Sequence, residues 1–145
     1  MTLAGFQSFV ASHADRFRGV RPLTTSDFDQ FESELGHRLP EAMRWLLGSH
    51  GYSDGCGVAN LDEAVAQTLA CRRVMSLPAH WLILNDRGDA GAVLLDMASG
   101  SVCWYDEHDI QTVVAGEPVP AADWFNGYAE WAVHCACSDE ADQLP

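Results

Sequence analysis

Residues 31–51, FESELGHRLPEAMRWLLGSHG, constrain the fold of this chain more than any other segment, because they predict two short helices joined by a tight corner. Apolar residues of the first helix recur at i, i+3 and i+7, as in a stripe that faces a core: Phe28, Phe31 and Leu35. Ser26 is placed to cap the start of this helix, with Asp29 three residues later in the capping-box position. Gly36 suits the left-handed backbone that ends a helix.

The second helix begins at the corner itself. Pro40 fits the first helical position, where a missing N–H costs nothing, and Glu41 complements the positive end of the helix dipole. A second apolar stripe follows: Met43, Leu46 and Leu47. Gly51 is placed to end this helix as Gly36 ends the first. The segment therefore predicts two helices packed on a common core, and it contains no catalytic motif.

This ordered pattern resembles the signature of the SUKH superfamily, the cell-wall-assembly-regulator-like (Smi/Knr-type) domains. The positions that carry the resemblance are Glu32, Leu35, Gly36, Leu39, Pro40, Trp45, Leu46, Leu47, His50 and Gly51. His50 stands where the family usually has Asn, and both residue types tolerate the backbone of a helix end. Four later positions lie in segments that resemble the family's central hairpins and closing helix: Trp81, Gly88, Asp96 and Trp131. The resemblance extends over roughly residues 24–132.

The rest of the chain predicts a single α+β domain, with an antiparallel-rich sheet of four to six strands flanked by N-terminal helices and a C-terminal helix. We expect helices over residues 3–17, 61–75 and 120–136, strands over 81–85, 92–96, 101–105 and 110–115, and a short strand at 57–59. The expected inward residues are Leu61, Val65, Leu69 and Val74 of helix 61–75, and Trp124, Tyr128 and Trp131 of the last helix. Short connections favour an antiparallel meander, because a parallel crossover needs about a dozen residues or more. We assign residues 1–137 to the domain and 138–145 to an acidic, frayed tail.

Charge divides the chain into two unequal halves. All eight basic residues are Arg, and the formal net charge is −13. Residues 1–73 contain seven Arg and nine acids, a balance of −2, whereas residues 74–145 contain one Arg and twelve acids, a balance of −11. Such a field repels nucleic acids and anionic membranes, and it attracts a basic protein and speeds the encounter with it. The alternative interpretation is that the acids only keep the domain soluble.

Composition is typical of a compact cytoplasmic protein. With 145 residues, of which 48% are apolar and 20% charged, the chain is long enough to build one core and too apolar to be disordered. No apolar run approaches the roughly 20 residues that cross a bilayer, and the first residues lack the basic start and apolar centre of a signal peptide. Five cysteines without regular spacing predict reduced thiols. We therefore expect a cytoplasmic location and neither a membrane nor a nucleic acid as partner.

Three segments carry candidate chemistry, and each has a plainer interpretation. His134-Cys135-x-Cys137 lacks the spacing of a structural zinc motif, so Cys135 is expected to be a small buried apolar residue. Residues 106–109, Asp-Glu-His-Asp, offer acid, base or cation-ligand chemistry, but a solvated turn between strands is the favoured interpretation. Residues 85–91 lack the ligand spacing of a calcium loop and predict a hairpin loop whose glycines adopt positive φ. With no hydrolase, phosphate-loop or dinucleotide motif, we expect no enzyme, metal or cofactor.

The resemblance also implies a function. The commonest bacterial role in the superfamily is that of an immunity protein, which binds a toxin domain delivered by a neighbouring cell and blocks it. The charge is compatible with this role, because many such toxins are nucleases with basic substrate grooves. We therefore expect the partner surface in the second half, at Asp86, Asp89, Trp104, Asp106, Glu107, Asp109 and Glu117. The alternatives are a scaffold or regulatory module of the same superfamily with an endogenous partner, and an enzyme or ligand binder that uses residues 106–109; the sequence specifies neither the partner nor an oligomeric state.

Overall fold

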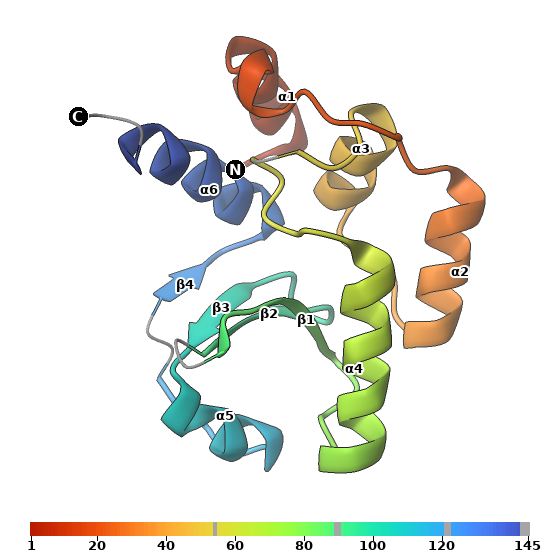
Figure 1. The fold of residues 1–145 in the computed structure, drawn as a ribbon, viewed down its shortest axis with the longest axis vertical. Coiled ribbons are helices and arrows are strands. Elements are labelled where there is room, and N and C mark those ends of the chain that lie inside the picture. Colours follow the sequence, from red (N-terminus) through yellow and green to blue (C-terminus); the bar gives the residue numbers. More distant parts are fainter. Residues whose placement is uncertain (54, 89–90, 121–122, 143–145) are drawn as a thin grey trace.

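A computed structural model describes residues 1–53, 55–88, 91–120 and 123–142, the last four of them as backbone only. The N-terminal half is helical and contains α1 (Leu3–Ser12), the 3-10 helix η1 (Ala14–Arg16), α2 (Thr25–Leu35), α3 (Glu41–Ser49) and α4 (Leu61–Met75). The C-terminal half contains β1 (Trp81–Asp86), β2 (Ala92–Asp96), β3 (Val102–Tyr105), α5 (Glu107–Val114), β4 (Asp123–Phe125) and α6 (Tyr128–Asp142). The predicted α+β class is confirmed (Figure 1).

The four strands form one antiparallel sheet in the order β1-β2-β3-β4. Its register places Leu94 of β2 between Ile83 of β1 and Cys103 of β3, and Cys103 lies opposite Trp124 of β4. The β1–β2 register shifts after Ile83, because β1 contains one extra residue there. Since successive side chains point to opposite faces of a sheet, the strands divide the interior into two apolar clusters.

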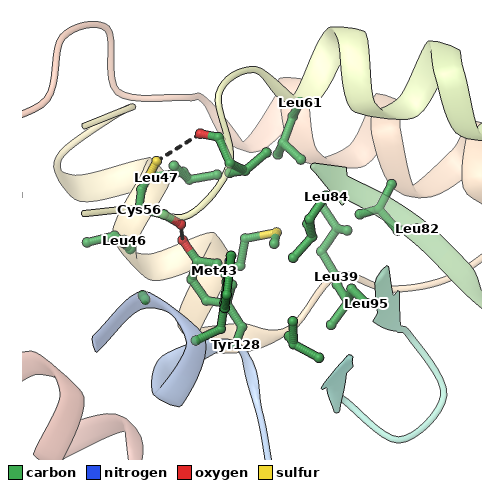
Figure 2. Close-up of a cluster of buried hydrophobic side chains, with 14 of the residues drawn as sticks. Leu39, Met43, Leu46, Leu47, Cys56, Leu61, Leu82, Leu84, Leu95 and Tyr128 are labelled. Atoms are coloured by element: carbon green, nitrogen blue, oxygen red, sulfur yellow. Dashed lines mark hydrogen bonds between the residues drawn. The ribbon is translucent and has the colours of Figure 1, made fainter. Parts of the chain in front are cut away.

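The first face of the sheet carries the main core. Leu82, Leu84 and Leu95 lie around Met43 of α3 and the corner residue Leu39 (Figure 2). The helical part of this core also contains the residues that the sequence predicted as inward stripes of α2 and α3: Phe28, Phe31, Leu35, Met43, Leu46 and Leu47. Each of these side chains is buried, so the two predicted stripes are confirmed.

Helix α6 fastens the irregular segment between α3 and α4 to the same core. Tyr128 is fully buried, and its hydroxyl donates a hydrogen bond to the carbonyl of Cys56 (Figure 2). The indole N–H of Trp131 donates to the carbonyl of Gly57 at 3.0 Å. Gly57 has φ of +75°, and a Cβ atom there would lie 2.3 Å from the indole nitrogen of Trp131. Only glycine therefore fits at this position.

The second face of the sheet carries a smaller cluster that α5 covers in part. Its buried members are Leu77, Trp81, Ile83, Ala92, Leu94, Cys103, Tyr105 and Val113. Ile110 and Val114 of α5 pack against this cluster while remaining half-exposed. An eight-residue helix is only about 12 Å long, so α5 cannot cover the whole face.

The predicted corner between α2 and α3 is present, with two differences at the starts of its helices. Pro40 is the N-cap residue of α3 and not its first helical residue. Thr24, not Ser26, caps α2: its hydroxyl accepts from the Asp27 N–H at 3.2 Å, and the Asp27 carboxylate accepts from the Thr24 N–H at 2.8 Å. The predicted partner Asp29 is therefore outside the capping box, because the helix begins two residues earlier than the sequence interpretation assumed. Gly36 ends α2 with φ of +75°, as predicted.

Glu32 explains why the signature begins with an acid. Its Oε2 accepts a hydrogen bond from the Leu39 N–H at 2.7 Å and lies 3.9 Å from Nε of Arg44 on α3. The carboxylate therefore ties α2 to the corner and to the following helix. This role is structural, as the sequence predicted for these positions.

Helix α4 closes one edge of the sheet. It begins after Asn60, whose side chain accepts from the Glu63 N–H, and it packs along β1 (Figure 1). Thr68 is fully buried; its hydroxyl accepts from the Ile83 N–H of β1 at 3.0 Å and donates to the Ala64 carbonyl at 2.7 Å. An edge strand normally presents unpaired backbone groups to solvent. Here a helix side chain satisfies one of them.

Two predicted elements are wrong in the second half. Residues 110–115 do not form a strand, because 107–114 form α5. The closing helix begins at Tyr128 and not at residue 120, because residues 123–125 pair with β3 as β4. Trp124 therefore lies on an edge strand, 57% exposed, and not in the core.

The remaining differences are at the ends of elements. The predicted helix over 3–17 stops at Ser12 and is followed by η1, and no strand forms at 57–59 in the described structure, which has an isolated bridge between Val20 and Tyr52. Val74, expected to point inward, is 82% exposed. Helix α6 extends to Asp142, into the segment expected to be frayed, and residues 143–145 lie outside the described residues. The division of the chain at residue 137 stays a prediction.

Candidate protein-binding site

A groove runs between α4 and α5 over the second face of the sheet. Its volume is about 280 Å³. Its walls are Gln67, Cys71 and Met75 of α4 and Glu107, Ile110, Gln111 and Val114 of α5; Leu77, Ile83, Asp86, Gly88, Gly91, Ala92 and Leu94 complete the lining. The lining is mostly apolar, with its carboxylates confined to Asp86 and Glu107. Such a concave apolar surface with a few polar groups is typical of a binding site.

Helical periodicity produces the two walls. Gln67, Cys71 and Met75 are four residues apart on α4, so they form one line along the helix. Residues 107, 110, 111 and 114 of α5 have the i, i+3, i+4, i+7 spacing of one helix face. The Thr68 hydrogen bond to β1 holds the first wall, and Val113, buried in the second cluster, holds the other.

The groove has an acidic end and an apolar end. Asp86 is the last residue of β1, and the register places it opposite Ala92, which in turn lies opposite Tyr105, two residues before Glu107. Asp86 and Glu107 are therefore at the same end of the sheet. Leu77 and Met75 line the other end, and the side chain of Met75 is 43% exposed.

Hydrogen bonds orient the carboxylate of Asp86. Its Oδ2 accepts from the side-chain amide of Gln67 at 2.8 Å, and its Oδ1 accepts from the Gly88 N–H at 2.9 Å. These bonds connect the end of β1 to α4 and to the loop that follows. The loop glycines have positive φ, +58° at Gly88 and +95° at Gly91, as the sequence predicted.

The carboxylates of α5 lie in its first turn. Asp106 is the N-cap residue, although its side chain makes no capping hydrogen bond, and Glu107 and Asp109 follow in the first turn. Acids at this end are favoured by the helix dipole. Residues 106–109 thus begin a helix; the predicted solvated turn between strands is wrong, although residues 106–108 are exposed.

Arginine does not neutralise this acidic end. Among the described residues, no ion pair involves Asp86, Asp106, Glu107 or Asp109. Arg72 is held elsewhere, donating to the carbonyls of Leu35 at 2.8 Å and Ala79 at 2.6 Å. Arg87 lies over the ring of Trp104, 4.7 Å from its centroid. The field of the carboxylates is therefore available to a cation from outside.

The structure separates the other predicted site residues from this groove. Glu117 lies beyond the far end of α5, beside a second hollow with His80 and Tyr105. Trp104 packs against the main core on the opposite face of the sheet, half-buried. Asp89 lies outside the described residues. The acids expected to form one surface are thus divided: Asp86 and Glu107 line the groove, whereas Glu117 lines the second hollow.

The apolar lining of the groove was not recognised in the sequence. Met75 and Ile110 belong to it, and the i, i+3, i+4 spacing of Ile110, Val113 and Val114 is the signal that identifies α5 as a helix. Burial raises the pKa of the Cys71 thiol, and the charge of Asp86 adds to this effect. Cys71 therefore contributes to the groove as a neutral, apolar side chain.

The terminal His134-Cys135-x-Cys137 segment has mainly aromatic neighbours. The His134 ring lies against Trp131, with centroids 5.9 Å apart, and against Phe125 at 5.0 Å. In the part of the chain that the structure describes, no three His, Cys, Asp or Glu side chains are grouped to hold a metal ion. Within the same residues, no helix combines the length and apolar character needed to span a membrane.

The signature corner, the antiparallel sheet and the helices around it define an α+β domain of the SUKH type. Residues 22–126 match the sequence model of the SMI1 / KNR4 family (SUKH-1), which covers well over half of the chain, so the protein belongs to this family. The matched region begins just before α2 and ends just after β4, and it includes the whole groove. A search of curated proteins finds no match to the chain.

Proposed function

We propose that this chain is an immunity protein that binds the basic surface of a cognate toxin and thereby blocks it. The observation that carries the proposal is the α4–α5 groove, whose apolar lining ends in the carboxylates of Asp86 and Glu107. Family membership supports it, because the SUKH resemblance implies this role for bacterial members. The proposal assigns binding and not catalysis to the chain.

The groove suits a basic segment with apolar side chains or long alkyl stems. Lys and Arg carry apolar stems that pack on apolar surface while the charged end stays accessible. A stem lying along Ile110 and Leu94 would place its cation toward Asp86 and Glu107. Binding in this way covers a basic toxin surface, which in a nuclease is the surface that holds phosphate.

The same charges would accelerate the encounter. Of the twelve acids in residues 74–145, none of those near the groove is neutralised by an arginine in the described structure, and the half has a balance of −11. Steering of this kind raises association rates by about 10- to 1,000-fold at low salt. The proposed location is the cytoplasm of the producing cell, which agrees with five cysteines that form no disulfide in the described structure.

The test is a pair of double variants of equal net charge, assayed with the toxin domain that the proposal expects a neighbouring gene to encode. Asp86→Lys/Glu107→Lys reverses the acidic end of the groove, and Asp15→Lys/Glu41→Lys reverses two exposed acids in the first half. Each pair contains one acid from the first turn of an α-helix, so the cost to the helix dipole is matched. Both variants should fold, as thermal unfolding will check.

The groove variant should associate about tenfold more slowly at low salt and lose most of its salt dependence, whereas the control should resemble the wild type. Equal association rates for the two variants would reject the groove as the partner surface. The alternative function, a scaffold with an endogenous partner, predicts that cells expressing the neighbouring toxin gene die whether or not this chain is present. Survival only with the chain supports immunity.

A further inference from the structure

The two edges of the sheet differ in how their backbone groups are satisfied. At β1, the hydroxyl of Thr68 accepts the Ile83 N–H, and α4 lies along the strand (Figure 1). At β4, Figure 1 shows the strand at the opposite margin of the sheet from α4. Apart from the bonds within the strand ladder, the backbone hydrogen bonds of the described residues include none to Trp124.

The hydrogen-bond register shows which β4 groups point outward. The Asp96 N–H donates to the Ser101 carbonyl at 2.8 Å, and the same register continues through the pair Leu94–Cys103. Hydrogen-bonded pairs alternate along an antiparallel ladder, so the backbone of Cys103 bonds to β2. Trp124, which lies opposite Cys103, therefore directs its own N–H and carbonyl away from β3.

The other edge confirms this alternation. The Met97 N–H donates to the His80 carbonyl at 2.7 Å, so these two residues form a hydrogen-bonded pair, and Leu82 with Leu95 forms the next one. Ile83 comes directly after Leu82, so its backbone N–H and carbonyl point away from β2. The Ile83 N–H is the group that Thr68 accepts. The same count thus finds an outward N–H on β1 that Thr68 caps, and an outward N–H on β4 that makes no loop or turn hydrogen bond with the backbone of the described residues.

The side chains of β4 separate its attachment from its exposed surface. Phe125 points to the main core and packs against Trp131, with ring centroids 5.3 Å apart. Trp124 points to the other face and is 57% exposed, the one exposed aromatic among the large exposed apolar residues of the described structure. Tryptophan is enriched among the residues that dominate binding energy at interfaces.

We propose that β4 is a second binding surface, which accepts an extended, basic segment of a partner protein as an added strand beside Trp124. Strand addition supplies main-chain hydrogen bonds, and the exposed indole supplies a face for an Arg or Lys side chain. The negative charge around β4 favours a basic partner, because Asp123 on β4 is exposed and residues 74–145 contain a single Arg. A second copy of this chain, with its own Asp123 and net charge of −13, is disfavoured as the occupant.

Two substitutions at the same position separate strand pairing from side-chain contact. Trp124→Val and Trp124→Pro both remove the indole, but only Pro removes the outward N–H. Proline is tolerated on an edge strand where the N–H faces away from the sheet, so both variants should fold. Asp123→Pro is the contrasting variant, because its N–H belongs to the pair with Trp104 and its loss should detach β4.

The probe is a synthetic peptide of alternating Arg and Val, with an alternating Glu–Val peptide as the control. Binding is followed by NMR, and amide exchange is read at Trp124. The proposal predicts that the Arg–Val peptide slows exchange of the Trp124 N–H about tenfold, that the Trp124→Pro variant binds it much more weakly than Trp124→Val, and that the Glu–Val peptide does not bind. Because the groove is not altered by these variants, the result is independent of the proposed immunity function.

Three results would overturn the proposal. The first is an unchanged exchange rate at Trp124 with the Arg–Val peptide present. The second is equal binding by the Pro and Val variants, which would reduce the surface to a side-chain contact. The third is protection of the Trp124 N–H that grows with protein concentration in the absence of peptide, which would make a second copy the occupant.

Discussion

The hydroxyl of Thr68 is a small group with a large expected effect, because it joins α4 to β1 and so fixes one wall of the groove. Thr68→Val replaces the hydroxyl by a methyl group of nearly the same shape and keeps the β-branched side chain. The Ala64 carbonyl keeps its helical hydrogen bond, but the Ile83 N–H loses its acceptor in a site with no exposed area. An unsatisfied buried donor costs about 1–3 kcal/mol.

The added methyl recovers part of this cost, so the net loss should be about 1–2 kcal/mol of unfolding free energy. For a domain of this size, that corresponds to a decrease of roughly 3–6 °C in Tm. Urea unfolding measures the loss, and amide exchange at Ile83 locates it. Thr68→Ser is the control: it loses packing but keeps the hydroxyl, so the Ile83 N–H should stay protected. If Thr68→Val unfolds at the wild-type urea concentration with unchanged Ile83 exchange, the assigned role of the hydroxyl is wrong.

Three further predictions concern the groove, the main core and alkaline pH. Met75→Ser should weaken toxin binding about tenfold by calorimetry, whereas Val74→Ser, the exposed neighbour outside the groove, should leave it unchanged; equal effects would contradict the groove. Tyr128→Phe should lose about 1–2 kcal/mol in urea unfolding, because the Cys56 carbonyl loses its donor, and wild-type stability would refute this. Burial, followed by the charge of the neighbouring Cys103 thiolate, raises the pKa of Tyr105 from 10.0 to about 12. The folded state therefore keeps a proton that the unfolded chain releases, so stability should be lost as pH rises from about 10 to about 12. Tyr105→Phe should reduce this loss, and an equal pH dependence in the variant would contradict the assignment.

Strong local signals made the N-terminal half predictable. Helix α4 was expected at residues 61–75 and has those bounds, because Asn60 offers a side-chain cap and Leu61, Val65 and Leu69 supply inward apolar spacing over most of its length. Gly36 and Pro40 likewise specify the corner between α2 and α3 through backbone geometry alone. Signals of this kind act within a few residues, and tertiary contacts do not reverse them.

The groove was hidden by two errors in the second half. Ile110, Val113 and Val114 have high strand propensity, but propensity is weaker than the burial gained when their helical spacing faces the second cluster. Trp124 fits the aromatic spacing of the closing helix, yet it lies on a three-residue strand that depends on pairing with β3. Pairing between distant segments leaves no local signal in the sequence. The hydrophobic pattern therefore did not predict which sheet face α5 covers, nor that α5 forms one wall of the groove.

The acidic residues show the same limit. Sequence reasoning identified the excess of carboxylates and proposed Asp86 and Glu107 for the partner surface from their position in the acidic half. It did not find that they share one end of a groove, because that depends on the register of β1, β2 and β3. Glu117 and Trp104 were grouped with them by closeness in sequence, and the fold places them elsewhere.

Hydrogen–deuterium exchange of the chain with and without its toxin tests the binding surface most directly. The account predicts that the toxin slows exchange in residues 67–77 and 107–114, which form the two walls of the groove, with little change in α2 and α3. Protection confined to α2 and α3, with the groove walls exchanging as in the isolated chain, would contradict it.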